Sequence, residues 1–120
     1  MTLLAQILVG IVAALHLSFL ILEMFLWNTP RGRATFGTTR EFAAESSVLA
    51  ANQGLYNGFL AAGLVWSLIA ADPVGFDVKV FFLACVIIAG LYGGATVNKR
   101  IVFIQAVPGA LALAAVLLTR

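Results

Sequence analysis

Charged residues and prolines divide the chain into four long stretches of almost entirely apolar residues. These stretches run over residues 3–27, 43–71, 78–97 and 101–118. Each has about 18 residues or more, enough for a helix to cross the ~30 Å hydrocarbon core of a bilayer. Helices are expected because lipid offers no hydrogen-bond partner to free backbone groups. The pattern therefore predicts an all-α integral membrane protein, a bundle of four transmembrane helices that forms one domain over residues 1–120.

The composition favours a bilayer over water as the solvent. Of the 120 residues, 62% are hydrophobic and 10% are charged, and the mean hydropathy is +1.07. Soluble proteins contain about 25% charged residues. The net charge of +2 is small and the basic residues are scattered, unlike the basic patch of a nucleic-acid-binding protein. We therefore expect the lipid bilayer, and no nucleic acid, as a partner.

The positions of lysine and arginine predict how the chain is inserted. Five of them lie in the connection over residues 28–42 and the turn over 98–100, whereas the opposite side carries Lys79 and Arg120. Because basic connections tend to stay in the cytoplasm, both termini are expected outside it. The expected location is the bacterial inner (plasma) membrane. The first stretch lacks the basic start and the short apolar core of a signal peptide, so we expect it to be retained.

Polar side chains interrupt the first stretch on one face. On a helix, His16, Glu23 and Trp27 lie within about 40° of one another, and His16 and Glu23 are roughly 10 Å apart along the axis. That distance excludes direct contact but allows both groups to line one site. A carboxylate inside a membrane is costly and indicates function, whereas a lone histidine is often structural.

The second stretch contains the segment ANQGLYNGFLAAG (51–63), which carries three amides and a phenol. Its polar side chains cover an arc of about 140° on a helix: Asn52, Gln53, Tyr56 and Asn57. Gly54, Gly58 and Ala62 lie on the other side, in the spacing that lets two helices approach closely in lipid. We therefore predict a polar face directed at a shared pocket and a packing face directed away from it.

The predicted pocket draws on all four helices. Glu23 and His16 are its expected catalytic residues, and its expected ligand-binding residues are Asn52, Gln53, Tyr56, Asn57, Gln105, Trp27 and Tyr92. The alternative is that the amides only hold the helices together, each contributing about 0.6 kcal/mol. Pro108 is expected to bend the last helix by freeing the carbonyl of Ile104.

No cofactor or metal is expected at this pocket. One histidine cannot supply two haem ligands, and one histidine with one glutamate and amides makes a poor transition-metal site. No glycine-rich phosphate-binding loop follows a strand. The single cysteine, Cys85, excludes an internal disulfide and is expected to be a packing residue.

These motifs resemble a known family. The runs ALHLSFLILEMFLW (14–27), FG (36–37) and ANQGLYNGFLAAGL (51–64), with the spacing Gln105-x-x-Pro108, are similar to small bacterial and fungal four-helix membrane proteins, catalogued as domain of unknown function 1304. The resemblance spans essentially the whole chain. It implies a four-helix membrane fold and supplies no activity, so function has to be argued from the site.

Two classes of function fit the predicted pocket. In the first, it binds a small lipophilic molecule and carries out cofactor-free acid–base chemistry of an isomerase or hydrolase kind, such as isomerisation, hydration or epoxide opening. In the second, the protein is a proton-coupled small-molecule exporter that acts as a homodimer. We favour the first class over the second and over a structural membrane subunit. The ligand, the reaction, the oligomeric state and the choice between enzyme and transporter are left open by the sequence.

Overall fold

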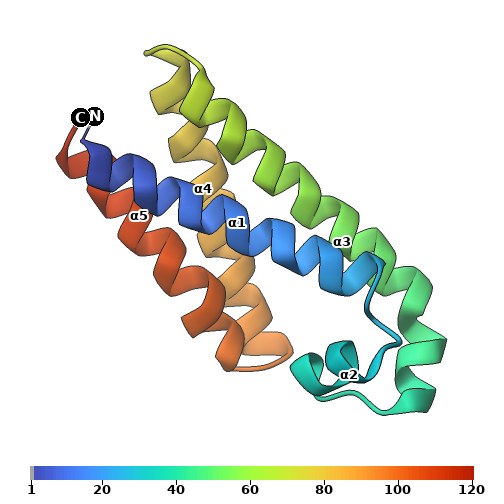
Figure 1. The fold of residues 1–120 in the computed structure, drawn as a ribbon. Helices are drawn as coiled ribbons and strands as arrows, with labels where there is room; N and C mark the ends of the chain where they lie inside the picture. The colour runs from blue at the N-terminus through green and yellow to red at the C-terminus, as the bar shows by residue number, and fades with distance from the viewer. Residues whose placement is uncertain (1) are drawn as a thin grey trace. The chain divides into compact units, whose positions relative to one another are not determined.

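A computed structural model describes residues 2–120, and every regular element among them is helical. In chain order the elements are α1 (Leu3–Met24), α2 (Pro30–Phe36), α3 (Arg40–Ile69), α4 (Val74–Thr96), the π-helix η1 (Val102–Ala106) and α5 (Val107–Leu118) (Figure 1). The predicted all-α class is confirmed for this part of the chain. Two helices, α1 and α4, are long and apolar enough to cross a membrane. Four spans and membrane insertion stay predictions.

The first helix ends three residues earlier than expected, at Met24 rather than Trp27. A second, short helix follows at once, because Thr29 and Pro30 form a helix start. Thr29 has extended backbone angles and its hydroxyl accepts the Gly32 amide hydrogen at 3.2 Å, while proline suits the first helical position. The connection expected over residues 28–42 thus contains α2.

Two other helix starts are set by side chains that the hydrophobic pattern ignored. The Thr39 hydroxyl accepts the Phe42 amide hydrogen at 3.1 Å, so α3 begins at Arg40 rather than at residue 43. The Asp72 carboxylate accepts the Phe76 amide hydrogen at 3.1 Å, so α4 begins at Val74 rather than at residue 78. Short polar side chains at these positions satisfy amides that have no partner inside the helix.

Pro108 changes the last helical stretch without ending it. Proline has no amide hydrogen to donate to Ile104. Just before it, the Val107 amide bonds to the Val102 carbonyl, five residues back, and residues 102–106 form η1. The predicted helix over 101–118 is therefore a π-helical turn followed by α5.

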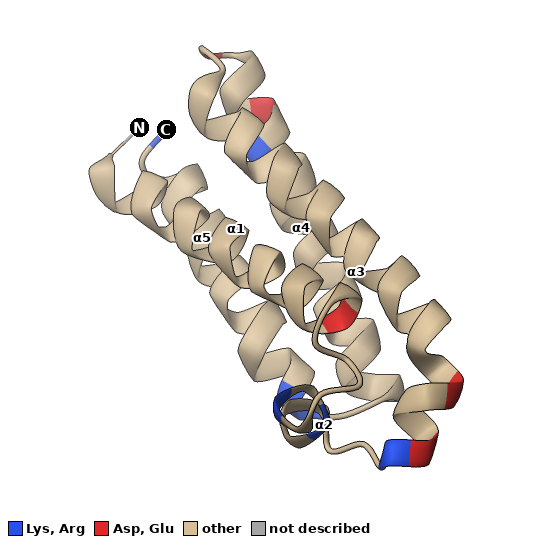
Figure 2. Cartoon of the chain, turned by 45° about the vertical axis from the view of Figure 1, so that its right-hand side comes forward, with Lys and Arg blue, Asp and Glu red and all other residues tan. Residues whose placement is uncertain are grey.

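Contacts divide the chain into two units. The first unit contains residues 2–14 and 60–120, and the second contains residues 15–59. The prediction of one domain over residues 1–120 stays a prediction. Charged residues gather near helix ends and connections, and helix interiors are almost free of them (Figure 2).

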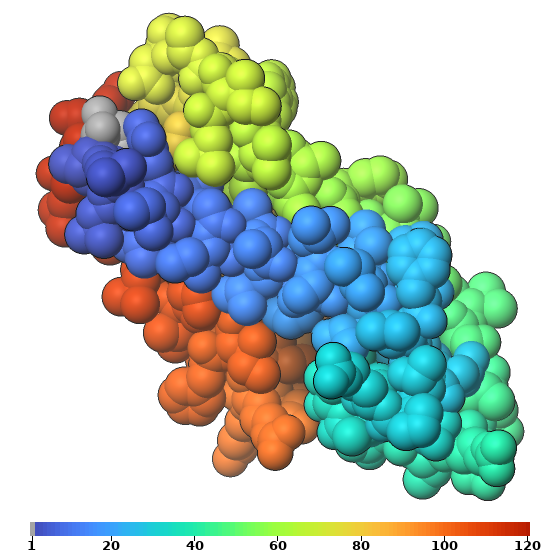
Figure 3. All heavy atoms as spheres, viewed as in Figure 1, coloured from blue at the N-terminus to red at the C-terminus, as the bar shows by residue number. Residues whose placement is uncertain are grey.

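The first unit holds the apolar core. In it α4 lies beside η1 and α5, and the start of α1 packs against α5, as the adjoining blue and red spheres show (Figure 3). The buried side chains of this core are Ala5, Val9, Val12, Ala13, Leu64, Phe76, Leu83, Val86, Ala112 and Val116. The side chains of Thr2 and Thr119 are hydrogen-bonded at 3.4 Å, so both ends of the described chain meet in this unit.

Candidate functional site

The second unit joins three predicted site residues in one chain of hydrogen bonds. The His16 Nδ1 lies 2.9 Å from the Asn57 side-chain oxygen. The Asn57 side-chain nitrogen donates to Glu23 Oε1 at 2.5 Å. His16 is 1% exposed and Glu23 is 5% exposed. An imidazole and a carboxyl group that α1 keeps two turns apart are therefore linked through one amide from α3.

A glycine contact brings α3 close enough for the short Asn57 side chain to reach α1. A Cβ atom on Gly54 would lie 2.7 Å from Met24 Cγ and 3.0 Å from Glu23 Cβ, and one on Gly58 would lie 2.5 Å from Leu20 Cδ1. Small residues allow such an approach. The prediction that this packing face points away from Glu23 is wrong, because the face lies against the same side of α1 that carries Glu23.

Asn57 lies nearer to Gly54 on α3 than Asn52 and Tyr56 do. On a helix it is about 60° from Gly54, whereas Asn52 and Tyr56 are about 160° from Gly54. The side chains of Asn52 and Gln53 are exposed, and Tyr56 is 59% exposed. The structure therefore brings Asn57 together with His16 and Glu23. It leaves Asn52, Gln53 and Tyr56 on the open side of α3, where Gln53 is exposed although it is only about 40° from Asn57 on the helix.

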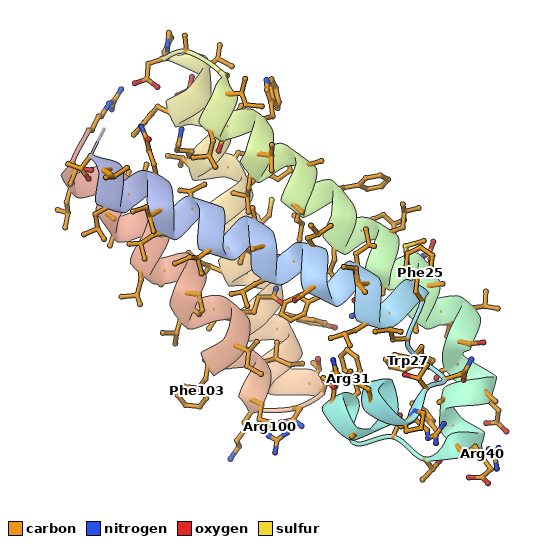
Figure 4. All side chains as sticks on the ribbon, in the orientation of Figure 1. Phe25, Trp27, Arg31, Arg40, Arg100 and Phe103 are labelled. Atoms are coloured by element: carbon orange, nitrogen blue, oxygen red, sulfur yellow. The ribbon has the colours of Figure 1, made fainter. Side chains whose placement is uncertain are left out.

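Trp27 has a different position from that expected for a ligand-binding residue. Its indole nitrogen donates to the Ser46 hydroxyl at 3.1 Å, and its ring packs on Phe36 with centroids 4.9 Å apart. Figure 4 shows Trp27 in the connection after α1, at the level of α2. Trp27 thus fastens this connection and α2 to the start of α3, and Ser46 is a partner that the hydrophobic pattern did not indicate.

The two remaining predicted residues belong to the first unit. Gln105, in η1, donates its side-chain amide to the Val86 carbonyl of α4 at 3.1 Å. Tyr92 is 71% exposed. Gln105 therefore bonds a backbone group, and neither residue makes a hydrogen bond to an ionisable side chain among the contacts of its unit.

Lys79, which we expected at the extracytoplasmic end of the third stretch, is a buried cation. It is 5% exposed, and its Nζ donates to the Ser67 carbonyl at 2.5 Å. Ser67 lies in the last turn of α3, where carbonyl groups lack helical partners and a cation is favourable. The available signal was a lysine in the second turn of α4, a helix that follows the end of α3 after a connection of four residues.

Metal-ligand clusters were also sought in the described part of the chain. Residues 2–120 contain no group of three or more His, Cys, Asp or Glu side chains placed to hold a metal ion. Cys85 is half-buried. What the second unit does offer chemically is an acid–base pair, Glu23 and His16, joined by an amide that both accepts and donates a hydrogen bond.

Comparison with known proteins identifies the family. The family described as "Protein of unknown function (DUF1304)" matches residues 10–117. An uncharacterized protein, YpaA of Lactococcus lactis subsp. lactis (strain IL1403), is 32% identical over 119 residues, which cover 98% of this chain and 97% of that protein. No solved structure matches the chain significantly. The family match includes α2, α3 and α4, about two thirds of α1 and nearly all of α5. The chain therefore belongs to the DUF1304 family.

Proposed function

We propose that the chain is an integral membrane protein whose four apolar stretches all span the bilayer. Two observations support four spans. Only 28% of the apolar window of α1 and of α4 is buried inside the protein, so a large apolar surface has to be covered by lipid or partners. The stretch Val102–Leu118 is a shorter apolar helix. In α3 the charged residues lie in its first two turns, and residues 48–69 are apolar apart from Asn52, Gln53, Tyr56, Asn57 and Ser67.

The proposed orientation places both termini outside the cytoplasm of a bacterial cell. Arg31 and Arg33 of α2 and Arg40 at the start of α3 support it, because basic connections remain inside. In the other connection that we place in the cytoplasm, Arg100 projects away from the helices (Figure 4). This basic residue supports the same orientation.

The proposed function is the binding of a small lipophilic molecule and the transfer of a proton to or from it by His16 and Glu23. The observation that carries it is the buried His16–Asn57–Glu23 chain. Ionisable groups inside a membrane protein are costly and are usually functional. A single amide between them gives each group a fixed partner, which suits general acid–base chemistry without a cofactor. Isomerisation, hydration and epoxide opening are reactions that such a pair could catalyse without a cofactor.

The test is to identify what the protein carries and whether it exchanges protons with it. The wild-type protein, Glu23→Gln and Glu45→Gln are purified in the same detergent, and small molecules released from them are identified by mass spectrometry. Each protein is then incubated with the identified molecule in D₂O. We expect the wild type and Glu45→Gln, whose carboxylate is exposed, to introduce deuterium, and Glu23→Gln to lose this activity. Equal deuterium incorporation in all three proteins, or the release of phospholipid alone, would contradict the proposal.

The second candidate is a proton-coupled exporter that acts as a homodimer. It is favoured by the open face of α3, where Asn52, Gln53 and Tyr56 are exposed. Amides cannot face lipid without partners, and an amide is complementary to its own copy because it both donates and accepts. Cysteines introduced at Asn52 would form a cross-linked dimer in this case. Acid-driven export of a lipophilic cation from vesicles, without deuterium incorporation, would favour this candidate over the first.

A further inference from the structure

The hydrogen-bond pattern at Asn57 fixes where its amide hydrogens lie. The side-chain nitrogen donates to Glu23 Oε1 at 2.5 Å. The side-chain oxygen therefore faces His16, at 2.9 Å from Nδ1. A carbonyl oxygen carries no hydrogen and can only accept. The hydrogen in this second bond must come from His16, so Nδ1 is protonated.

This assignment determines the role of the other ring nitrogen. In a neutral imidazole one nitrogen carries the hydrogen and the other has a free lone pair. With the hydrogen on Nδ1, the lone pair is on Nε2. His16 Nε2 makes no hydrogen bond to any side chain or backbone group in residues 2–120. The His16 ring also packs edge-to-face with Phe19, with ring centroids 5.2 Å apart.

We propose that Asn57 is a positioning residue that holds His16 in the Nδ1–H tautomer and thereby presents Nε2 as a proton acceptor to a lipophilic molecule bearing a hydroxyl group. This inference rests on the proposed function and names the atom and the ligand class. In an isomerisation, the hydroxyl proton of an enol moves to Nε2 while its carbon–oxygen bond becomes a carbonyl, and the imidazolium, after exchange with solvent, gives a proton to the neighbouring carbon. The O–H bond broken is balanced by the C–H bond formed, and the ligand is neither oxidised nor reduced.

During the proton transfer at Nε2, Glu23 acts through Asn57. By accepting from the Asn57 nitrogen, Glu23 keeps the amide oxygen directed at Nδ1, and its negative charge balances the imidazolium that forms. In other enzymes, the side chain that hydrogen-bonds a catalytic histidine and fixes its tautomer has a large effect on the reaction rate. Here an amide stands between the imidazole and the carboxylate, so Glu23 and Asn57 act together.

The tautomer of His16 can be determined by NMR without resonance overlap, because the sequence contains one histidine. The protein is labelled with ¹⁵N-histidine, and the ring nitrogens are observed at pH 8. We expect a one-bond N–H coupling at Nδ1 and none at Nε2. Asn57→Leu should move the hydrogen to Nε2, the site favoured by an imidazole without partners, while Asn52→Leu, on the open face of α3, should change nothing. A wild-type spectrum with the hydrogen on Nε2, or on both nitrogens, would overturn the assignment, and this readout does not depend on the variant folding.

A second titration separates the ligand class from the tautomer. The wild-type protein is titrated with 1-decanol and, as a control, with decane. If Nε2 accepts a hydrogen bond from a ligand hydroxyl group, the ¹⁵N resonance of Nε2 should shift in a saturable way with decanol and should not shift with decane. Equal shifts with both, or none with either, would refute the ligand class. The Nδ1–H tautomer is tested independently, and a failure of deuterium incorporation would refute the proposed function while leaving the tautomer in place.

Discussion

Two glycine contacts, one in each unit, differ in what they bring together. In the second unit a Cβ on Gly54 of α3 would meet side-chain atoms of α1, with Met24 Cγ at 2.7 Å and Glu23 Cβ at 3.0 Å. In the first unit a Cβ on Gly90 of α4 would lie 2.8 Å from the backbone nitrogen of Ala106. Both contacts depend on the missing side chain. Only the first lies beside an ionisable group.

The side-chain amides near the two glycine contacts, Gln105 and Asn57, also differ in the groups to which they are hydrogen-bonded. Gln105 bonds the Val86 carbonyl, a backbone group, whereas Asn57 bonds two buried ionisable side chains. A polar group bonded to backbone holds helices together and can do little else. A polar group that joins an imidazole to a carboxylate can also move or direct protons. The comparison therefore separates an amide that bonds a backbone group from one that joins two ionisable side chains, and the second is the one to which we assign a function as a proposal.

The largest effect on stability is expected from Asn57→Leu. The change leaves both His16 and Glu23 without their partner, and each buried group left unsatisfied costs about 1–3 kcal/mol. Thermal unfolding in detergent, measured beside Asn52→Leu at an exposed position, checks this. Equal melting temperatures for the two variants would show that the buried chain of hydrogen bonds contributes nothing to the fold.

Gly90→Ala is expected to be the next most harmful change. The added methyl group meets the Ala106 backbone, which cannot rotate away as a side chain can, and overpacking costs about 1–3 kcal/mol. Gly10→Ala is the matched control, because a Cβ there has nothing within 4 Å and alanine favours a helix by about 0.5–1 kcal/mol. The melting temperature should fall for the first variant and rise for the second. A rise for both would contradict the close α4–η1 contact.

A smaller difference is expected within the second unit, between Gly54→Ala and Gly58→Ala. At Gly58 the added methyl group meets only the tip of Leu20, a flexible side chain, whereas at Gly54 it meets Met24 and the Cβ of Glu23. Gly54→Ala should therefore be the less stable of the two by about 1 kcal/mol, as measured by thermal unfolding. The reverse order would mean that α1 and α3 can separate at Gly54 without strain.

Gln105→Leu should have the smallest effect. A single interhelical hydrogen bond in a membrane protein contributes about 0.6 kcal/mol, and the Val86 carbonyl lies within a helix that supplies other partners. Its melting temperature should stay near that of the wild type, and deuterium incorporation into the identified ligand should be unchanged. Loss of incorporation would place Gln105 in the functional site after all.

Sequence reasoning located the helices and the stripe shared by His16 and Glu23, because both follow from helical periodicity. It placed helix ends less well, since Thr29, Thr39 and Asp72 set those ends through local side-chain bonds. Such bonds do not alter the hydrophobic pattern from which the stretches were drawn.

Asn57 was grouped with Asn52, Gln53 and Tyr56 because all four are polar and lie on one broad arc. A helical projection gives the direction of a side chain but not the neighbour that covers it. The glycines decided the outcome, because the close contact of α3 with α1 requires them. The burial of Lys79 could not be predicted from the sequence for the same reason. Its hydrogen bond to the Ser67 carbonyl depends on the end of α3 lying beside α4 in space.

The most direct test of the central claim, that the His16–Asn57–Glu23 chain serves function rather than stability, replaces all three residues at once. In the variant His16→Leu, Glu23→Met and Asn57→Leu no polar group is left without a partner, and such replacements in other proteins are neutral or stabilising by about 1–4 kcal/mol. Thermal unfolding and deuterium incorporation are measured on the same preparation. The account predicts a melting temperature equal to or above that of the wild type, with deuterium incorporation lost. A melting temperature as low as that of Asn57→Leu, with incorporation retained, would contradict it.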